Sequence, residues 1–213
     1  MRSGSDPATV WLDGRLAGSD LIRLYFSLSE SGLDPREGAQ ALGSLADLYV
    51  LGRCNVLASF GAARVGRDRL IGFHWPDGRL LHAVLACSPQ AAGEPLRGDC
   101  VDMLGRMPLR MLAVALADLV GSVQVQVGDI LDEGDFLAGE AEALERLCPL
   151  LPWLRSAMSL PVPGDVGADG FLQAAAWFRM AATAGEGVEI ERTRLTEAER
   201  WREAAAAPRG LRE

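Results

Sequence analysis

The sequence predicts an α+β fold, in which an antiparallel sheet of four or five strands is flanked by helices and followed by a helical C-terminal part. The first observation is a hairpin signal: apolar residues 70–75 and 79–87 flank Pro-Asp-Gly at 76–78, which is typical of a tight turn between antiparallel strands. The second is the alternation in residues 122–127, SVQVQV, which is typical of a half-buried strand. The third is the set of capped, helix-periodic segments on both sides of these strands.

The individual helices begin and end at recognisable signals. Ser19 precedes an apolar-periodic segment that Gly32 ends, and Asp34 followed by Pro35 opens a second helix that runs to about Gly52. The other predicted segments, in chain order, are a short strand or turn at 8–16, a segment at 54–63 with both helical and strand character, a strand at 99–104, a helix at 108–121, a helix with an acidic outer face at 133–147, a short helix that ends near 158, a short strand at 188–193 and a charged helix from 196.

Composition divides the chain into three parts. Residues 1–158 form the predicted α+β domain, residues 159–170 (SLPVPGDVGADG) form a Pro- and Gly-rich linker, and residues 171–213 form a helical C-terminal extension. The helix after the linker begins with Phe171 and carries more apolar surface than an isolated helix leaves in water. We therefore expect it to dock on the N-terminal body or on another chain, and in the second case the C-terminal helices would form a homo-oligomer interface.

The composition restricts the classes of partner and the compartment. The net charge is −8, and no cluster of Lys and Arg forms a phosphate-binding stripe, so we expect no nucleic-acid partner. The N-terminus lacks the apolar region of a secretory signal, and no apolar run approaches the roughly 18 residues that span a membrane. The cysteines lack the spacing of a disulfide framework or a zinc site, so we expect a cytoplasmic protein with reduced thiols, no metal and no cofactor. These cysteines are Cys54, Cys87, Cys100 and Cys148.

Three polar residues between Gly52 and Gly105 suggest a catalytic set. Cys54 opens a segment of small residues, His82 interrupts the apolar run LLHAVLA, and Asp102 lies in the next apolar run, CVDMLG. A thiolate is the reactive form of cysteine, and a helix N-terminus or a nearby imidazolium favours it. A histidine takes the proton, and an acid fixes the tautomer and orientation of that histidine. This order predicts Cys54 as nucleophile, His82 as general base and Asp102 as the residue that orients His82.

Each of these residues also has another interpretation. Free cysteine is among the most buried residue types, so the ordinary interpretation of Cys54 is an inert core thiol. His74 is a second candidate for the base, and Asp99 is a second candidate for the acid. Strand alternation puts Cys100 and Asp102 on one face and Asp99 on the other. Cys100 packed beside a solvent-facing Asp102 is therefore a further, non-catalytic interpretation of this strand.

Three motifs resemble the papain-like cysteine hydrolase superfamily in its compact bacterial forms. They are GRCNVLA around Cys54, LLHAVLA around His82 and DCVDMLG around Asp102, and the resemblance covers about 55 residues of the chain. Proteins of this superfamily carry the cysteine at a helix start, the histidine on a strand and the third residue one strand later. The resemblance implies the same roles for Cys54, His82 and Asp102 that their order suggests.

Two classes of function remain from the sequence. One is a cysteine-dependent amide hydrolase or acyl transferase, acting on a protein or peptide, with the backbone N–H of Cys54 or Asn55 as oxyanion donor. The alternative is a non-catalytic interaction protein, such as a chaperone, an adaptor or an assembly subunit. An exposed Cys54 beside His82 would favour the enzyme, whereas a buried Cys54 with an apolar groove elsewhere would favour the interaction protein.

Overall fold

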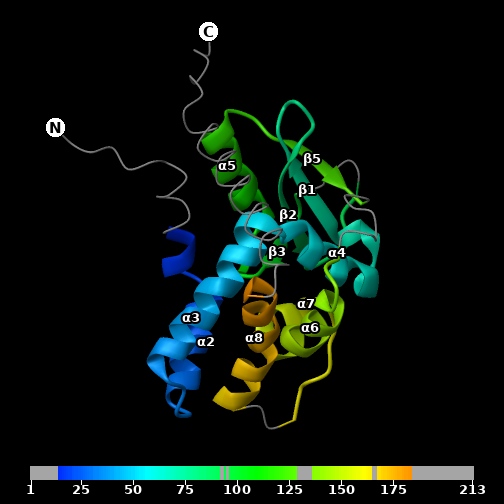
Figure 1. Cartoon of the computed structure of the whole chain (residues 1–213). Helices are drawn as coiled ribbons and strands as arrows, with labels where there is room; N and C mark the ends of the chain where they lie inside the picture. The colour runs from blue at the N-terminus through cyan, green and yellow to red at the C-terminus, as the bar shows by residue number, and fades with distance from the viewer. Residues whose placement is uncertain (1–13, 92–93, 95, 129–135, 165–166, 184–213) are drawn as a thin grey trace, which may run out of the picture.

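A five-stranded antiparallel sheet with helices on both faces forms the centre of the computed structural model (Figure 1). The structure describes residues 14–91, 94, 96–128, 136–164 and 167–183. The strands lie in the order β4-β3-β2-β1-β5 and are β1 (Leu70–His74), β2 (Leu80–Ala86), β3 (Asp99–Asp102), β4 (Gly105–Pro108) and β5 (Gln124–Val127). The predicted α+β class is confirmed.

Helices precede, interrupt and follow the strands. They are α2 (Asp20–Ser29), α3 (Pro35–Ala46), α4 (Cys54–Val65), α5 (Leu109–Val120), α6 (Glu140–Leu147), α7 (Pro152–Ala157) and α8 (Ala168–Thr183), with a π-helical segment Asp47–Gly52 and 3-10 turns at Arg67–Arg69 and Cys148–Leu150. The predicted caps are present: the Ser19 hydroxyl accepts from the Ile22 N–H, and the Asp34 carboxylate accepts from the N–H groups of the first turn of α3. Within the described ranges, no helix has the length and apolar character needed to cross a membrane.

The central hairpin forms where the sequence predicts it. β1 and β2 pair in antiparallel register, and the Trp75 N–H donates to the Arg79 carbonyl across the turn at 2.8 Å. Gly78 has a φ of +87°, a conformation that L side chains rarely adopt, and Asp77 accepts from the Arg79 N–H at 3.1 Å. Turn chemistry at three residues thus determines how β1 and β2 are joined.

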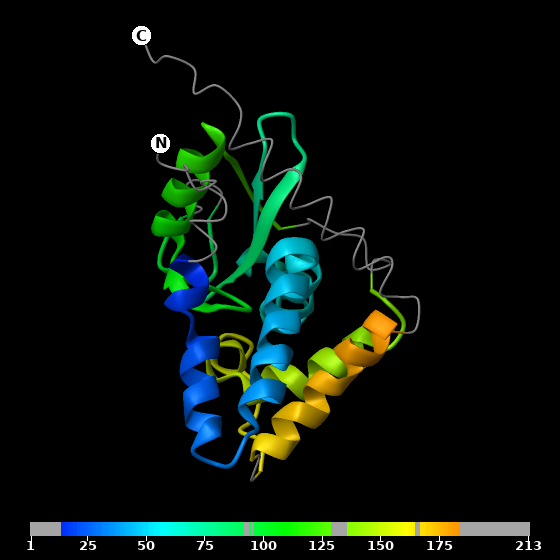
Figure 2. The same ribbon diagram turned by 60° about the vertical axis from the view of Figure 1, so that its left-hand side comes forward.

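The two faces of the sheet bury separate hydrophobic clusters. On one face, Ala83 and Leu85 of β2 pack with α4, α3, α6, α7 and the start of α8. On the other face, Ile71, Phe73 and Val84 pack under α5. Figure 2 shows α5 (green) on one side of the strands and α4 (cyan) on the other. A residue on the sheet therefore belongs to one of two distinct environments.

The structure corrects several predicted segments. Residues 14–17 are helical, not a strand or turn, and residues 8–13 lie outside the described ranges. The segment of mixed character at 54–63 is helix α4, since its small residues permit close packing on β2. The predicted strand at 99–104 is shorter, because a tight turn at Met103 and Leu104 leads into β4, which the sequence analysis missed.

Two helices in the C-terminal half begin later or earlier than the sequence predicts. Helix α6 begins at Glu140 and not at 133; residues 129–135 lie outside the described ranges. α8 begins at Ala168 and not at 171, while the strand predicted at 188–193 and the helix predicted from 196 lie in residues that the structure does not describe.

Helix α8 docks on its own chain. Phe171 is 2% exposed and belongs, with Ala174 and Ala175, to the cluster that also contains residues of α3 and α6. Docking on the N-terminal body, one of the two predicted cases, therefore accounts for the apolar start of this helix. The face of α8 that carries these residues is used within the chain, not left for a second copy.

We predict that Gly78→Val destabilises the protein by about 1 kcal/mol or more, because a β-branched residue is strained at positive φ. Gly43→Ala is the matched control: Gly43 is inside α3 with open space around its Cβ position, so alanine should leave stability unchanged or raise it by up to about 1 kcal/mol. Chemical denaturation of both variants measures the difference, and equal midpoints for Gly78→Val and wild type would contradict the prediction.

Candidate functional site

The structure brings the side chains of Cys54, His82 and Asp102 together. Cys54 is the first residue of α4, His82 lies in β2, and Asp102 is the last residue of β3. α4 packs directly on β2, and β2 pairs with β3, so two neighbour relations of the fold produce the group. His82 Nε2 lies 3.4 Å from Asp102 Oδ2, and Cys54 interacts with the same imidazole.

His82 has the electrostatic environment of a cation. His82 is completely buried, and burial by itself disfavours a charged imidazolium. Attraction by Cys54 and by Asp102 outweighs this burial, and the pKa of His82 is raised to about 10. Among the described residues, neither ring nitrogen makes a hydrogen bond of good geometry, so the 3.4 Å contact with Asp102 is mainly a charge attraction.

Asp102 is held as a carboxylate by several donors. Its burial alone would raise the pKa, but Arg15 and His82 outweigh burial and lower the pKa of Asp102 to about 2. Arg15 Nη2 donates to Asp102 Oδ2 at 2.6 Å, and the Leu104 N–H donates to Oδ1 at 2.9 Å. The Trp153 indole donates to the Asp102 backbone carbonyl at 2.9 Å, which fixes the end of β3. Asp102 is 4% exposed, so the interpretation of a solvent-facing acid is wrong.

The alternative base and acid lie in other contacts. His74 Nδ1 is 3.0 Å from the Gly78 carbonyl oxygen, at the hairpin turn. Asp99 accepts from Arg106 Nε at 2.8 Å on the exposed side of β3. Strand alternation therefore separates Asp99 from Asp102 as the sequence predicts, and the structure places His82 beside Cys54 and Asp102 beside His82.

A second buried group fixes the start of α4. Glu140 is fully buried, and its Oε1 accepts from Arg53 Nε at 2.9 Å and from the Tyr49 hydroxyl at 3.1 Å. Its Oε2 accepts from Arg53 Nη2 at 2.7 Å and from the Leu137 N–H at 2.9 Å. Arg53 immediately precedes Cys54, so this bidentate pair anchors the residue from which α4 begins.

Sequence reasoning missed both Arg15 and Glu140. Arg15 lies 87 positions from Asp102, in a segment predicted as a strand or turn, and no local pattern connects the two. The sequence predicts a helix at 133–147 with an acidic outer face, and nothing singles out Glu140, which is 0% exposed. The available signal was weak: Glu140 follows Gly139 at the start of the apolar-periodic part of α6, where a first-turn acid is common.

The other three thiols lie in environments that keep them neutral. Burial raises the pKa of Cys148 to about 12 and raises the pKa of Cys100 well above its ordinary value. Burial also raises the pKa of Cys87, which is half-buried. Cys54 differs from them because it lies at a helix start and interacts with the buried imidazole of His82.

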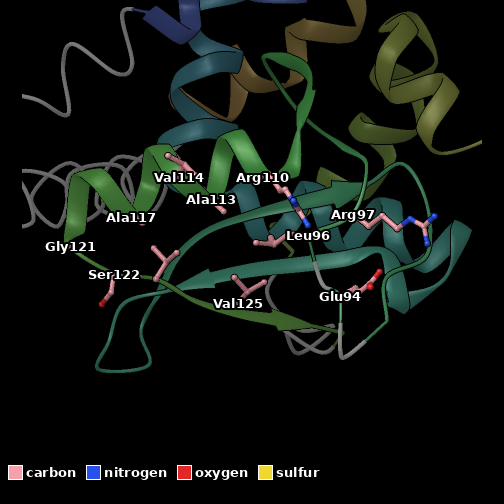
Figure 3. A pocket seen from close by; sticks show the side chains of 11 residues that line it. Glu94, Leu96, Arg97, Arg110, Ala113, Val114, Ala117, Gly121, Ser122 and Val125 are labelled. Carbon is pink, nitrogen blue, oxygen red and sulfur yellow. The ribbon is translucent and has the colours of Figure 1, made fainter.

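Cys54 is a buried residue. Cys54 is 6% exposed and belongs to the hydrophobic cluster on the α4 face of the sheet. Elsewhere, a cavity of about 880 Å³ lies on the α5 face, between α5 and β5 (Figure 3). The structure thus has one feature expected of the enzyme, which is Cys54 beside His82. It also has the two features expected of an interaction protein, which are a buried Cys54 and a groove elsewhere. Within the described ranges, no group of three or more His, Cys, Asp or Glu residues has a metal-binding arrangement.

Comparison with known proteins adds no relative. No family model, no curated protein and no solved structure matches the chain.

We predict that Glu140→Gln destabilises the protein by about 3–5 kcal/mol, because the buried Arg53 charge loses its counter-charge. Glu145→Gln is the matched control: Glu145 pairs with Arg64 but is about half exposed, so its loss should cost about 1 kcal/mol or less. Urea denaturation measures both values. Similar losses of unfolding free energy in the two variants would show that the Arg53–Glu140 pair stabilises the protein no more than a surface pair does.

Proposed function

We propose that the chain is a cysteine-dependent amide hydrolase or acyl transferase. The observation that carries the proposal is the contact of Cys54, at the start of α4, with the buried His82, whose pKa is raised by Cys54 and Asp102. A thiolate beside an imidazolium is the resting form from which a cysteine nucleophile acts. The resemblance to the papain-like superfamily assigns the same residues the same roles.

The proposed reaction begins with attack of the Cys54 thiolate on the carbonyl carbon of a peptide amide or an ester. The carbonyl oxygen becomes an oxyanion, and first-turn N–H groups of α4, including that of Asn55, lack carbonyl partners within the helix and are suitable donors. His82 then gives its proton to the leaving amine or alcohol as the carbon–nitrogen or carbon–oxygen bond breaks. A thioester on Cys54 remains.

The second half of the reaction decides between hydrolase and transferase. His82, now neutral, takes a proton from water or from an acceptor amine, which attacks the thioester carbon and displaces the Cys54 thiolate. Water gives a carboxylic acid, and an amine gives a new amide. In either case the imidazolium and thiolate are restored, and Asp102, held ionised by Arg15, keeps the imidazole oriented.

The proposed substrate is a protein or peptide in the cytoplasm. The four cysteines are free thiols, which supports a reducing compartment. Because Cys54 is only 6% exposed, we expect the substrate to reach it as a slender, extended segment and not as a bulky folded surface.

The second candidate is a non-catalytic interaction protein, such as a chaperone, an adaptor or an assembly subunit. The low exposure of Cys54 and the cavity between α5 and β5 favour it. In that case Cys54, His82 and Asp102 would serve as a buried polar group that stabilises the fold. Thiol chemistry distinguishes the two candidates, because a structural cysteine does not form an acyl intermediate.

The first prediction for this site concerns alkylation by iodoacetamide. Cys54 should react at pH 6 faster than Cys87, Cys100 and Cys148, because His82 remains protonated until the pH approaches about 10 and an imidazolium beside the sulfur favours the thiolate. The rate of an ordinary thiol falls about tenfold for each pH unit below its pKa. In His82→Gln the advantage of Cys54 over the other cysteines at pH 6 should therefore be lost.

Peptide mapping by mass spectrometry measures these rates for each cysteine in the folded protein. Asp77→Asn, at the distant hairpin turn, is a control that changes charge without touching the site. Equal labelling of all four cysteines, or no labelling without denaturant, would remove the nucleophile from the proposal.

The second prediction concerns the acyl intermediate. Rapid mixing with p-nitrophenyl acetate should release about one equivalent of p-nitrophenolate per chain in a burst and leave an acetyl thioester on Cys54. Cys54→Ala should lose the burst, whereas Cys87→Ala should keep it. A slow release without a burst, or acetylation of other residues at the same rate, would favour the non-catalytic candidate.

A further inference from the structure

The cavity between α5 and β5 has an apolar part and a charged end. Its apolar and small lining residues come from α5, from the segment that leads into β5 and from the loop before β3: Leu96, Ala113, Val114, Ala117, Val123 and Val125. Glu94, Arg97 and Arg110 line it too, and Figure 3 shows these three toward the end opposite Gly121 and Ser122. Polarity therefore changes along the groove in one direction.

Among the residues that the structure describes, the two arginines of the charged end have no ion-pair partner. Neither the Arg97 nor the Arg110 guanidinium forms an ion pair with a carboxylate of the described chain, and both residues are exposed. Other arginines, such as Arg79 and Arg106, have acidic partners within 3 Å. With Glu94 beside them, the charged end carries a net positive charge on a protein whose overall charge is −8. This end is complementary to an acidic group.

Strand β5 forms one edge of the sheet beside this groove. The Gly128 N–H donates to the Leu70 carbonyl at 2.9 Å, so Leu70 and Gly128 are a hydrogen-bonded pair of the antiparallel ladder. Because such pairs alternate with non-bonded pairs, Val125 and Val127 direct their N–H and C=O groups away from β1. No strand of the described chain pairs with this outer edge. The backbone of β5 therefore offers donors and acceptors next to the apolar lining.

We propose that the groove between α5 and β5 binds an extended peptide segment that pairs with the outer edge of β5. Its alternate apolar side chains would pack on Val114, Ala117 and Val125, and an acidic side chain or a C-terminal carboxylate would pair with Arg97 and Arg110. Added strands gain affinity from main-chain hydrogen bonds and specificity from side-chain pockets. A fatty carboxylate would satisfy the apolar lining and the arginines, but it would leave the donors of the β5 edge unused.

This groove is separate from the proposed thiol chemistry. Cys54 belongs to the cluster on the α4 face of the sheet, whereas Ala113 belongs to the cluster on the α5 face and Val125 packs against that cluster. Peptide binding in the groove should therefore persist in Cys54→Ala. Loss of the acetyl burst would leave this proposal intact, and loss of peptide binding would leave the burst intact.

The test uses a phage-displayed library of random heptapeptides selected on the full-length protein. Parallel selections use the double charge-reversal variant Arg97→Glu/Arg110→Glu and the control Arg36→Glu, an exposed arginine at the start of α3. We expect wild type and control to enrich peptides with alternating Val, Ile or Leu and an Asp, Glu or free carboxylate at one end. The double variant should bind these peptides at least about tenfold more weakly, in line with loss of a charge-assisted pair.

Two further measurements complete the test. Binding of an enriched synthetic peptide, followed by NMR, should slow hydrogen exchange of the Val125 and Val127 amides, and decanoate should not displace the peptide. The proposal is overturned if no peptide is enriched over the double variant, if enriched peptides lack an acidic group, or if those amides stay unprotected. Displacement by decanoate would also overturn it, in favour of an acyl ligand.

Discussion

The candidate site depends on the close approach of α4 to β2. A Cβ atom at Gly61 would lie 2.6 Å from Leu85 Cδ2 and 2.9 Å from Met158 Cε, distances that real Cβ atoms essentially never show. Glycine at this position therefore lets the helix lie directly on the strand, with Ala58 and Ala62 buried in the same helix. Close packing fixes the distance between helix and strand. It thereby sets where the first residue of α4 stands relative to His82.

The direction in which α4 begins is determined by a second constraint. Arg53 is buried just before the helix and is held by both oxygens of Glu140, which also accepts from Tyr49 and from the Leu137 backbone. A buried ion pair adds little net stability compared with apolar packing, but it tolerates few geometries once it is formed. Burial and Glu140 also raise the pKa of Tyr49 well above its ordinary value, so its hydroxyl remains a donor. The packing of α4 on β2 and the Arg53–Glu140 pair together determine the position of Cys54.

The sequence was informative where the physics is local. Pro-Asp-Gly at 76–78 predicts the hairpin, and Asp34 with Pro35 predicts a helix start, because turn and cap preferences act over a few residues. The order of Cys54, His82 and Asp102 also predicts their proximity, since a helix packed on a strand and the strand after it are neighbours in many α+β folds. Their catalytic role is a proposal that geometry supports but that composition alone could not separate from a buried polar group.

The remaining parts of the site could not be predicted, because they depend on contacts across the whole chain. Arg15 and Asp102 are 87 residues apart, as are Arg53 and Glu140, and nothing within a helical or strand period connects either pair. Trp153 packs in the hydrophobic cluster on the α4 face of the sheet, and its indole N–H also donates to the Asp102 carbonyl. A polar atom on an otherwise apolar residue gives no periodic signal, so only the folded chain reveals its partner.

The arginine on Asp102 changes what the acid can do for His82. In a pair of Asp and His alone, the carboxylate would carry its full negative charge toward the imidazole. Here Arg15 Nη2 is 2.6 Å from the oxygen that lies 3.4 Å from His82, so the arginine neutralises much of that charge. Asp102 therefore acts mainly as a fixed carboxylate whose remaining charge attracts the imidazole, while Cys54 provides the larger attraction for a proton on His82. In the proposed reaction, this arrangement places the proton donor for the leaving group beside the nucleophilic sulfur.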